Sequence, residues 1–188
     1  MELLSLLHDP SLKGPHDIEL VGDYAYLAGK WGAFSIVDVS DPLSPTLIGV
    51  LSEGVDNAET ILPLGETCLL GTNDLLAVDV SSRSQPTIRT RIHDERVNRI
   101  NGMVRRNKTV YAANKSHLID VFEIDAANEP RLVDAYDTTV SGILSPHDVA
   151  LMDNWLITVD QRKDAPLKVQ IYRVWDDGPI PCEQWEVV

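Results

Sequence analysis

Four positions of the chain carry residue types that can bind a metal ion or transfer protons. They are His16, Glu59, Asn101 and His147, which together offer two imidazoles, a carboxylate and an amide. Two histidines and a carboxylate suit Zn, Fe or Mn. If His16, Glu59 and His147 meet, they predict a divalent transition metal site and the chemistry of a metal-dependent hydrolase or oxidoreductase.

Asp17 and Asp148 directly follow the two histidines. Carboxylates beside metal-bound imidazoles often accept a hydrogen bond from the ligand, so both are candidates to accept such a bond or to act as additional ligands. Two other interpretations compete with the metal site. The six side chains can form a polar channel site without a metal, or they can simply hydrogen-bond neighbouring parts of the fold, in which case no cofactor is expected.

The four positions lie 43, 42 and 46 residues apart because the chain repeats itself. Asp38, Asp79 and Glu123 mark a second block in the first three copies, and each is followed by a proline seven positions later. A fourth, degenerate copy of this block starts at Arg173. A period of about 40 to 50 residues, filled with short strands, is typical of propeller blades.

Each copy divides into four expected strands. In the first copy they are Asp17–Val21, Tyr24–Ala28, Phe34–Val39 and Thr46–Leu51, where strand-forming residues alternate with turn residues. Such a unit must bury both faces against its neighbours. We therefore expect an all-β fold, a β-propeller of four-stranded antiparallel blades, with about four blades in one domain. The blades are expected at residues 16–54, 59–96, 101–141 and 147–188.

In a propeller the innermost strands line the axis, and their starting ends gather at one mouth of the channel. His16, Asp17, Glu59, Asn101, His147 and Asp148 all stand at those ends. The sequence therefore predicts that these six residues converge at the channel mouth.

The sequence predicts one fourth strand more than the four blades require. Leu3–Leu7 aligns with a fourth strand that has no blade before it, so residues 1–9 are expected to be a spare outer strand, and Cys182–Val187 is another fourth strand. The chain can be part of a longer array, two chains can share one ring by exchanging strands, or a four-blade ring can close alone with one strand displaced. An open arc would expose strand edges and apolar faces, which favours self-association, for example as a homodimer that completes the ring.

The segment Gly22–Gly49, which reads GDYAYLAGKWGAFSIVDVSDPLSPTLIG, resembles the LVIVD repeat family. The second copy keeps LAVDVS at positions 76–81 and Pro86, whereas Glu123 and Arg173 replace the aspartate in the last two copies. The resemblance implies a β-propeller. It also implies similarity to secreted or surface-associated bacterial and archaeal proteins, mostly of unknown role, and so says little about activity.

Several other residues are expected to be structural. Asp38 and Asp79 precede tight connections, where a carboxylate can accept backbone N–H bonds and fix the turn. Cys68 and Cys182 fall at different places in the repeat and are expected to be reduced packing residues. The four tryptophans are expected to pack the blades: Trp31, Trp155, Trp175 and Trp185.

The net charge of −13 disfavours binding to nucleic acids and to anionic membrane surfaces. No apolar run reaches the roughly 18 residues that span a bilayer, and the first residues lack the basic start of a signal peptide. The expected location is the cytoplasm for a full-length product, and the cell exterior or surface for a fragment of a secreted parent.

The function expected from these features is non-catalytic: a propeller scaffold that binds a protein or small ligand on its loop face. One alternative is a metal-dependent hydrolase or oxidoreductase whose site lies at the channel mouth. Another is a self-assembling structural fragment of a longer propeller.

Overall fold

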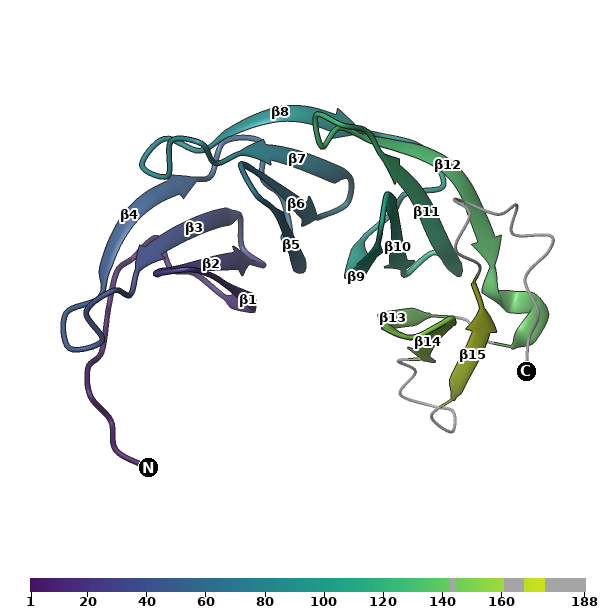
Figure 1. Ribbon diagram of the computed structural model, residues 1–188, viewed down its shortest axis with the longest axis horizontal. Coiled ribbons are helices and arrows are strands. Elements are labelled where there is room, and N and C mark those ends of the chain that lie inside the picture. The colour runs from purple at the N-terminus through teal and green to yellow at the C-terminus, as the bar shows by residue number, and fades with distance from the viewer. Residues whose placement is uncertain (143–144, 161–167, 175–188) are drawn as a thin grey trace. The chain divides into compact units, whose positions relative to one another are not determined.

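The computed structural model describes residues 1–142, 145–160 and 168–174, and its regular structure is almost entirely β-strand (Figure 1). The chain forms two compact units, Met1–Arg91 and Ile92–Val188. The one helical element in the described residues is a single 3₁₀ turn, η1 (Thr138–Ser141). None of the helical structure in that part of the chain is long and apolar enough to cross a membrane. The all-β prediction is thus confirmed.

The first unit holds two antiparallel sheets, each with its four strands in chain order. The strands of the first sheet are β1 (Pro15–Val21), β2 (Tyr24–Gly29), β3 (Ala33–Asp38) and β4 (Thr46–Leu51). Those of the second are β5 (Thr60–Leu64), β6 (Thr67–Gly71), β7 (Leu75–Asp79) and β8 (Thr87–Ile92). This is the blade topology that the repeat predicts.

The second unit repeats the arrangement. Its first sheet contains β9 (Ile100–Arg106), β10 (Thr109–Asn114), β11 (Leu118–Ile124) and β12 (Pro130–Asp137). Its second sheet contains, within the described residues, β13 (Pro146–Met152), β14 (Trp155–Asp160) and β15 (Val169–Arg173). The fourth strand predicted at Cys182–Val187 lies outside the described residues.

Sheets within a unit pack through apolar faces. In the first unit, Tyr26, Phe34 and Ile36 are fully buried in one cluster with Leu70 and Leu76 of the second sheet. The rings of Tyr26 and Phe34 meet edge to face, with centroids 5.7 Å apart. Because side chains alternate along a strand, each sheet offers one face to each neighbour, which explains why a single copy cannot fold alone.

The second unit has a matching core. Tyr111, Ile119 and Val121 of its first sheet are buried with Leu156 and Tyr172 of its second. The repeat therefore specifies the same packing in both units, even though the aspartate of the motif is lost in the second.

The repeated aspartates of the first two copies hold turns, as predicted. Asp38 Oδ1 accepts hydrogen bonds from the Ser40 backbone N–H at 2.9 Å and from Ser40 Oγ at 2.6 Å. Asp79 accepts the same pair from Ser81, at 2.9 and 2.6 Å. These hydrogen bonds hold the pKa of both carboxyl groups below its usual value.

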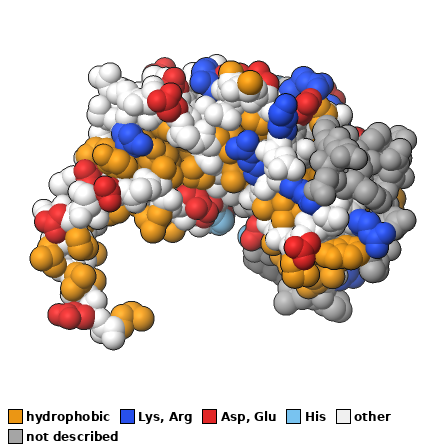
Figure 2. Space-filling model, viewed as in Figure 1, with side chains coloured by type: hydrophobic (Ala, Val, Ile, Leu, Met, Phe, Trp, Pro, Cys, Tyr) orange, Lys and Arg blue, Asp and Glu red, His pale blue; other side chains and the backbone are white. Residues whose placement is uncertain are grey.

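The N-terminal segment, residues 1–9, forms no strand ladder with any other described residue. Ser5 Oγ donates to the Pro42 carbonyl at 2.7 Å. Leu3, Leu4 and Leu6 stay exposed, and Figure 2 shows hydrophobic side chains along this protruding tail. The segment belongs to none of the described sheets, and both its role as a spare outer strand and its pairing with a second chain stay predictions.

Candidate functional site

Three of the four candidate positions lie in β-bulges at the start of a first strand. The pairing of β1 with β2 shifts between Pro15 and Asp17, so His16 is the extra residue, and His147 is the extra residue of β13 in the same way. In β9 the pairing passes from Ile100 to Gly102 and leaves Asn101 unmatched. A bulge redirects a side chain at the end of a ladder.

Glu59 forms the centre of a polar cluster in the first unit. Its carboxylate is 1% exposed and lies 3.1 Å (Oε1) and 3.2 Å (Oε2) from Lys30 Nζ. His16 Nε2 lies 3.2 Å from Glu59 Oε2, and His16 Nδ1 lies 2.8 Å from the Glu59 carbonyl oxygen. Since that carbonyl can only accept, Nδ1 donates to it, and Nε2 faces a carboxylate oxygen, which is likewise an acceptor. His16 of β1 and Lys30 of the β2–β3 turn thus hold Glu59, the residue before β5, so the cluster joins the two sheets.

Asp17 joins the same two sheets through the backbone. Its Oδ2 accepts from the buried Ile61 N–H at 2.9 Å, and its Oδ1 accepts from Ile18 N–H at 2.8 Å. Both nitrogens of the His16 ring instead face Glu59, so the partner of that ring is Glu59 rather than Asp17. In the first unit, then, three predicted residues do come together, and all of them bind neighbouring elements of the fold.

Asp148 has the equivalent place in the second unit. Its Oδ1 accepts from Val149 N–H at 2.8 Å, as Asp17 does from Ile18. It lies so close to β9 that a Cβ added at Gly102 would be 2.2 Å from Asp148 Oδ1. Glycine at position 102 therefore permits the close approach of β13 to β9.

Asn101 and His147 also belong to the second unit. The Asn101 amide is buried, and neither its Nδ2 nor its Oδ1 has a hydrogen-bond partner among the described residues. Those residues contain no group of three or more His, Cys, Asp or Glu side chains placed to hold a metal ion. The ligand set of His16, Glu59 and His147 stays a prediction.

Trp31 departs from its predicted packing role, because its side chain is 76% exposed. It lies on the turn between β2 and β3, which is fixed by hydrogen bonds from Lys30 N–H to the Gly14 carbonyl (2.9 Å) and from Gly32 N–H to the Gly29 carbonyl (3.1 Å). A Cβ at Gly14 would lie 2.9 Å from Trp31 Cδ2, so the indole rests directly on the Gly14 backbone. The ring is therefore supported on one side and open on the other.

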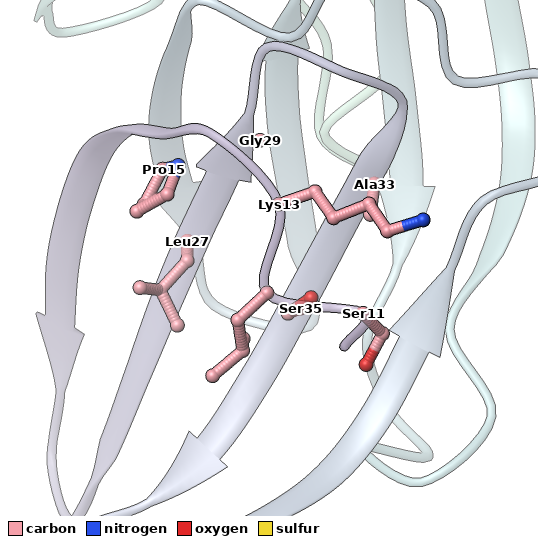
Figure 3. Close-up of a pocket in the computed structure, with 8 residues that line it drawn as sticks. Ser11, Lys13, Pro15, Leu27, Gly29, Ala33 and Ser35 are labelled. Atoms are coloured by element: carbon pink, nitrogen blue, oxygen red, sulfur yellow. The ribbon is translucent and has the colours of Figure 1, made fainter. Parts of the chain in front are cut away.

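A groove of about 350 Å³ lies beside this indole, a volume within the range of small-ligand sites. Its walls include Pro10, Ser11, Lys13, Trp31, Val50 and Ser52. Figure 3 shows the segment that forms one wall: it crosses β2 and β3, with Lys13 leaving it on the side of Ala33, away from Leu27. A second, much smaller pocket under this segment, about 10 Å³ between Leu12, Leu27 and Ser35, has room for about one water.

This groove was not predicted from the sequence. Trp31 stands in a Gly-Lys-Trp-Gly turn, and residues on turns are usually at the surface, so this context is a signal that could have indicated exposure. Lys13 has no feature that distinguishes it from any other surface lysine.

Two further titratable side chains, Asp120 and Cys68, are buried. Asp120 on β11 is fully buried, and burial raises the pKa of its carboxyl group to about 7. Burial likewise raises the pKa of the Cys68 thiol far above its usual value, which makes it an unreactive packing residue, as predicted. Cys182 lies outside the described residues, as do Trp175 and Trp185.

Comparison with known proteins agrees with this fold. The LVIVD repeat family matches residues 15–52 and 70–94. The chain contains LVIVD repeats. The resemblance of Gly22–Gly49 is thereby confirmed, and the four sheets are the blades of a β-propeller. No curated protein matches the sequence at a significant level.

Several solved structures share the fold of this chain at low identity. The computationally designed Ika4 protein has a TM-score of 0.66 at 13% identity, over 93% of this chain and 99% of its own. A protein from Lactobacillus plantarum has 0.71 at 11%, over 93% and 56%, and BamB from Moraxella catarrhalis has 0.58 at 12%, over 77% and 40%. The chain thus spans about half the length of these two natural proteins.

Proposed function

We propose that this chain is a non-catalytic propeller scaffold that binds its ligand on a loop face. The observation that carries the proposal is Trp31: a large apolar side chain, 76% exposed, held on a hydrogen-bonded turn beside a groove. Exposed aromatic side chains on loops that a rigid scaffold positions are typical of binding sites.

The polar residues of the first unit support the same proposal. The Glu59 carboxylate already faces Lys30 and His16, and Asp17 already accepts from Ile61. A metal ion at Glu59 would have to displace the Lys30 ammonium group. In our account these side chains therefore join neighbouring sheets. For this reason we favour the binding scaffold over a metal-dependent enzyme.

A ligand screen separates the two functions. Thermal unfolding of the protein is measured with a panel of small metabolites and, separately, divalent metal ions, for the wild type, Trp31→Ala and His16→Ala. Ligands that stabilise the wild type and His16→Ala but not Trp31→Ala support the scaffold, because a ligand raises Tm only in a protein that binds it. Stabilisation that is lost in His16→Ala and kept in Trp31→Ala would favour the enzyme.

We also propose that the chain self-associates through its N-terminal segment. Leu3, Leu4 and Leu6 are exposed on a segment that is anchored to the first sheet by the hydrogen bond of Ser5 to Pro42. An exposed extended apolar segment is a ready partner for a strand edge. Light scattering should give a dimer mass for the whole chain and a smaller mass after deletion of residues 1–9; a monomer mass in both would refute this.

A further inference from the structure

The groove beside Trp31 presents hydrogen-bond donors and a positive charge. Lys13 is a charged residue of its lining, and it has no ion-pair partner among residues 1–142, 145–160 and 168–174. The Trp31 indole N–H and the Ser52 hydroxyl likewise have no hydrogen-bond partner in that part of the chain. No acidic side chain lines the groove. In a chain with 29 acidic and 16 basic residues, this is an unusual local composition.

Asp9, which directly precedes the lining residue Pro10, is already engaged. Asp9 Oδ1 accepts from Ser11 N–H at 2.9 Å and from Ser11 Oγ at 2.5 Å. These bonds hold the pKa of the Asp9 carboxyl below its usual value, so the group stays ionised and bonded to Ser11. It therefore does not pair with Lys13 in this structure.

The remaining walls are mostly apolar. Pro10 and Val50 flank the groove, and the open side of the indole faces solvent because its other side rests on Gly14. An indole face stacks on rings and apolar chains. The groove thus combines a stacking surface with an ammonium group and two neutral donors.

We propose that this groove binds a carboxylate that carries a ring, with the ring stacked on Trp31 and the carboxylate bonded to Lys13. The proposal rests on the proposed function and adds the chemical class of the ligand. Both a free aromatic acid and the C-terminus of a peptide that ends in an aromatic residue carry this chemistry. The ammonium–carboxylate hydrogen bond is the source of discrimination, since charge-assisted bonds are about twice as strong as neutral ones.

The test uses titration calorimetry of the full chain with 3-phenylpropanoate and with its neutral amide. We expect the wild type to bind the carboxylate about tenfold more tightly than the amide. Lys13→Met should abolish this preference, and Trp31→Ala should abolish binding of both probes. Lys108→Met, at an exposed lysine of the second unit, is the matched control and should leave the preference unchanged.

A second pair of probes identifies the source of the ligand. A tetrapeptide ending in phenylalanine is compared with its C-terminal amide; tighter binding of the free peptide acid than of 3-phenylpropanoate identifies a peptide terminus, and the reverse identifies a free acid. Equal binding of each acid and its amide by the wild type would overturn the proposal, as would no binding at about 10 mM. Either result leaves the proposed function standing if ligands from the screen still depend on Trp31. Circular dichroism of each variant confirms that it is folded.

Discussion

Asp120→Asn should change how the stability of the protein depends on pH. The Asp120 side chain is fully buried, and its Oδ2 accepts from Asn114 Nδ2 at 2.8 Å, while its Oδ1 has no hydrogen-bond partner among the described residues. Burial raises the pKa of this carboxyl group from 3.8 to about 7, and Asp94 adds to the increase, whereas the Asn114 hydrogen bond and Arg96 oppose it. Asparagine keeps the shape of the side chain but cannot ionise.

The direction in which stability changes with pH depends on whether the folded or the unfolded state holds the Asp120 proton. Between about pH 4 and pH 7 the folded protein keeps the proton on Asp120 and the unfolded chain has lost it, so stability falls as the pH rises through this window. The window covers roughly three pH units at about 1.36 kcal/mol each, which gives a loss of about 4 kcal/mol at pH 8 relative to pH 4. Asp120→Asn should not show this loss.

Urea unfolding followed by circular dichroism, with hydrogen exchange of β10 and β11 amides, measures the difference between the two proteins from pH 4 to pH 8. We expect the variant to become progressively more stable than the wild type as the pH rises. Asp79→Asn is the control: the Ser81 bonds lower the Asp79 pKa below 3.8, so their stabilisation is lost only as the pH falls below about 4, and the difference between this variant and the wild type should stay constant from pH 4 to pH 8. A difference between wild type and Asp120→Asn that is constant with pH would refute the reasoning.

Three further predictions concern the residues at the starts of the first strands. Gly102→Ala should destabilise the protein by about 1–3 kcal/mol, because the new Cβ would lie 2.2 Å from Asp148 Oδ1 and 2.9 Å from Asp148 Cα; an unchanged Tm would contradict this. Asp17→Ala should cost about 1–3 kcal/mol and speed exchange of the Ile61 amide, whereas the exposed Asp23→Ala should not. Protein purified without a histidine tag should contain far less than one equivalent of metal, and EDTA should leave its Tm unchanged; one equivalent that is lost in His16→Ala would restore the metal site.

The fold could be predicted because the same strand pattern occurs several times in the sequence. A strand pattern that recurs at nearly equal spacing fixes the blade, and the aspartate before each early turn, at positions 38 and 79, gives the local chemistry that ends the third strand. The pairing of the N-terminal segment could not be predicted in the same way. Which strand edge this segment would pair with depends on the arrangement of the whole ring or on a second chain, and the repeat pattern describes neither.

The candidate site was predicted in part. Repeat spacing placed His16 next to Glu59, since equivalent positions of adjacent blades become neighbours. Glu59 is neutralised by Lys30 of the β2–β3 turn. This turn lies between the two sequence blocks by which the repeat is recognised, so the pairing could not be predicted from the repeat. Trp31 was assigned to packing because size and apolarity favour burial, while its exposure depends on Gly14 lying beneath the ring. The raised pKa of Asp120 likewise depends on burial that no local pattern reveals.

An NMR titration of the ¹⁵N-labelled protein with 3-phenylpropanoate tests the central claim most directly, because it reports every amide at once. We predict that the Trp31 indole N–H and the backbone amides of Lys13 and Ser52 shift, and that the amides of Glu59 and Ile61 do not. Shifts centred on Glu59 and His16, with Trp31 unmoved, would show that the polar cluster is the binding site and would contradict the account.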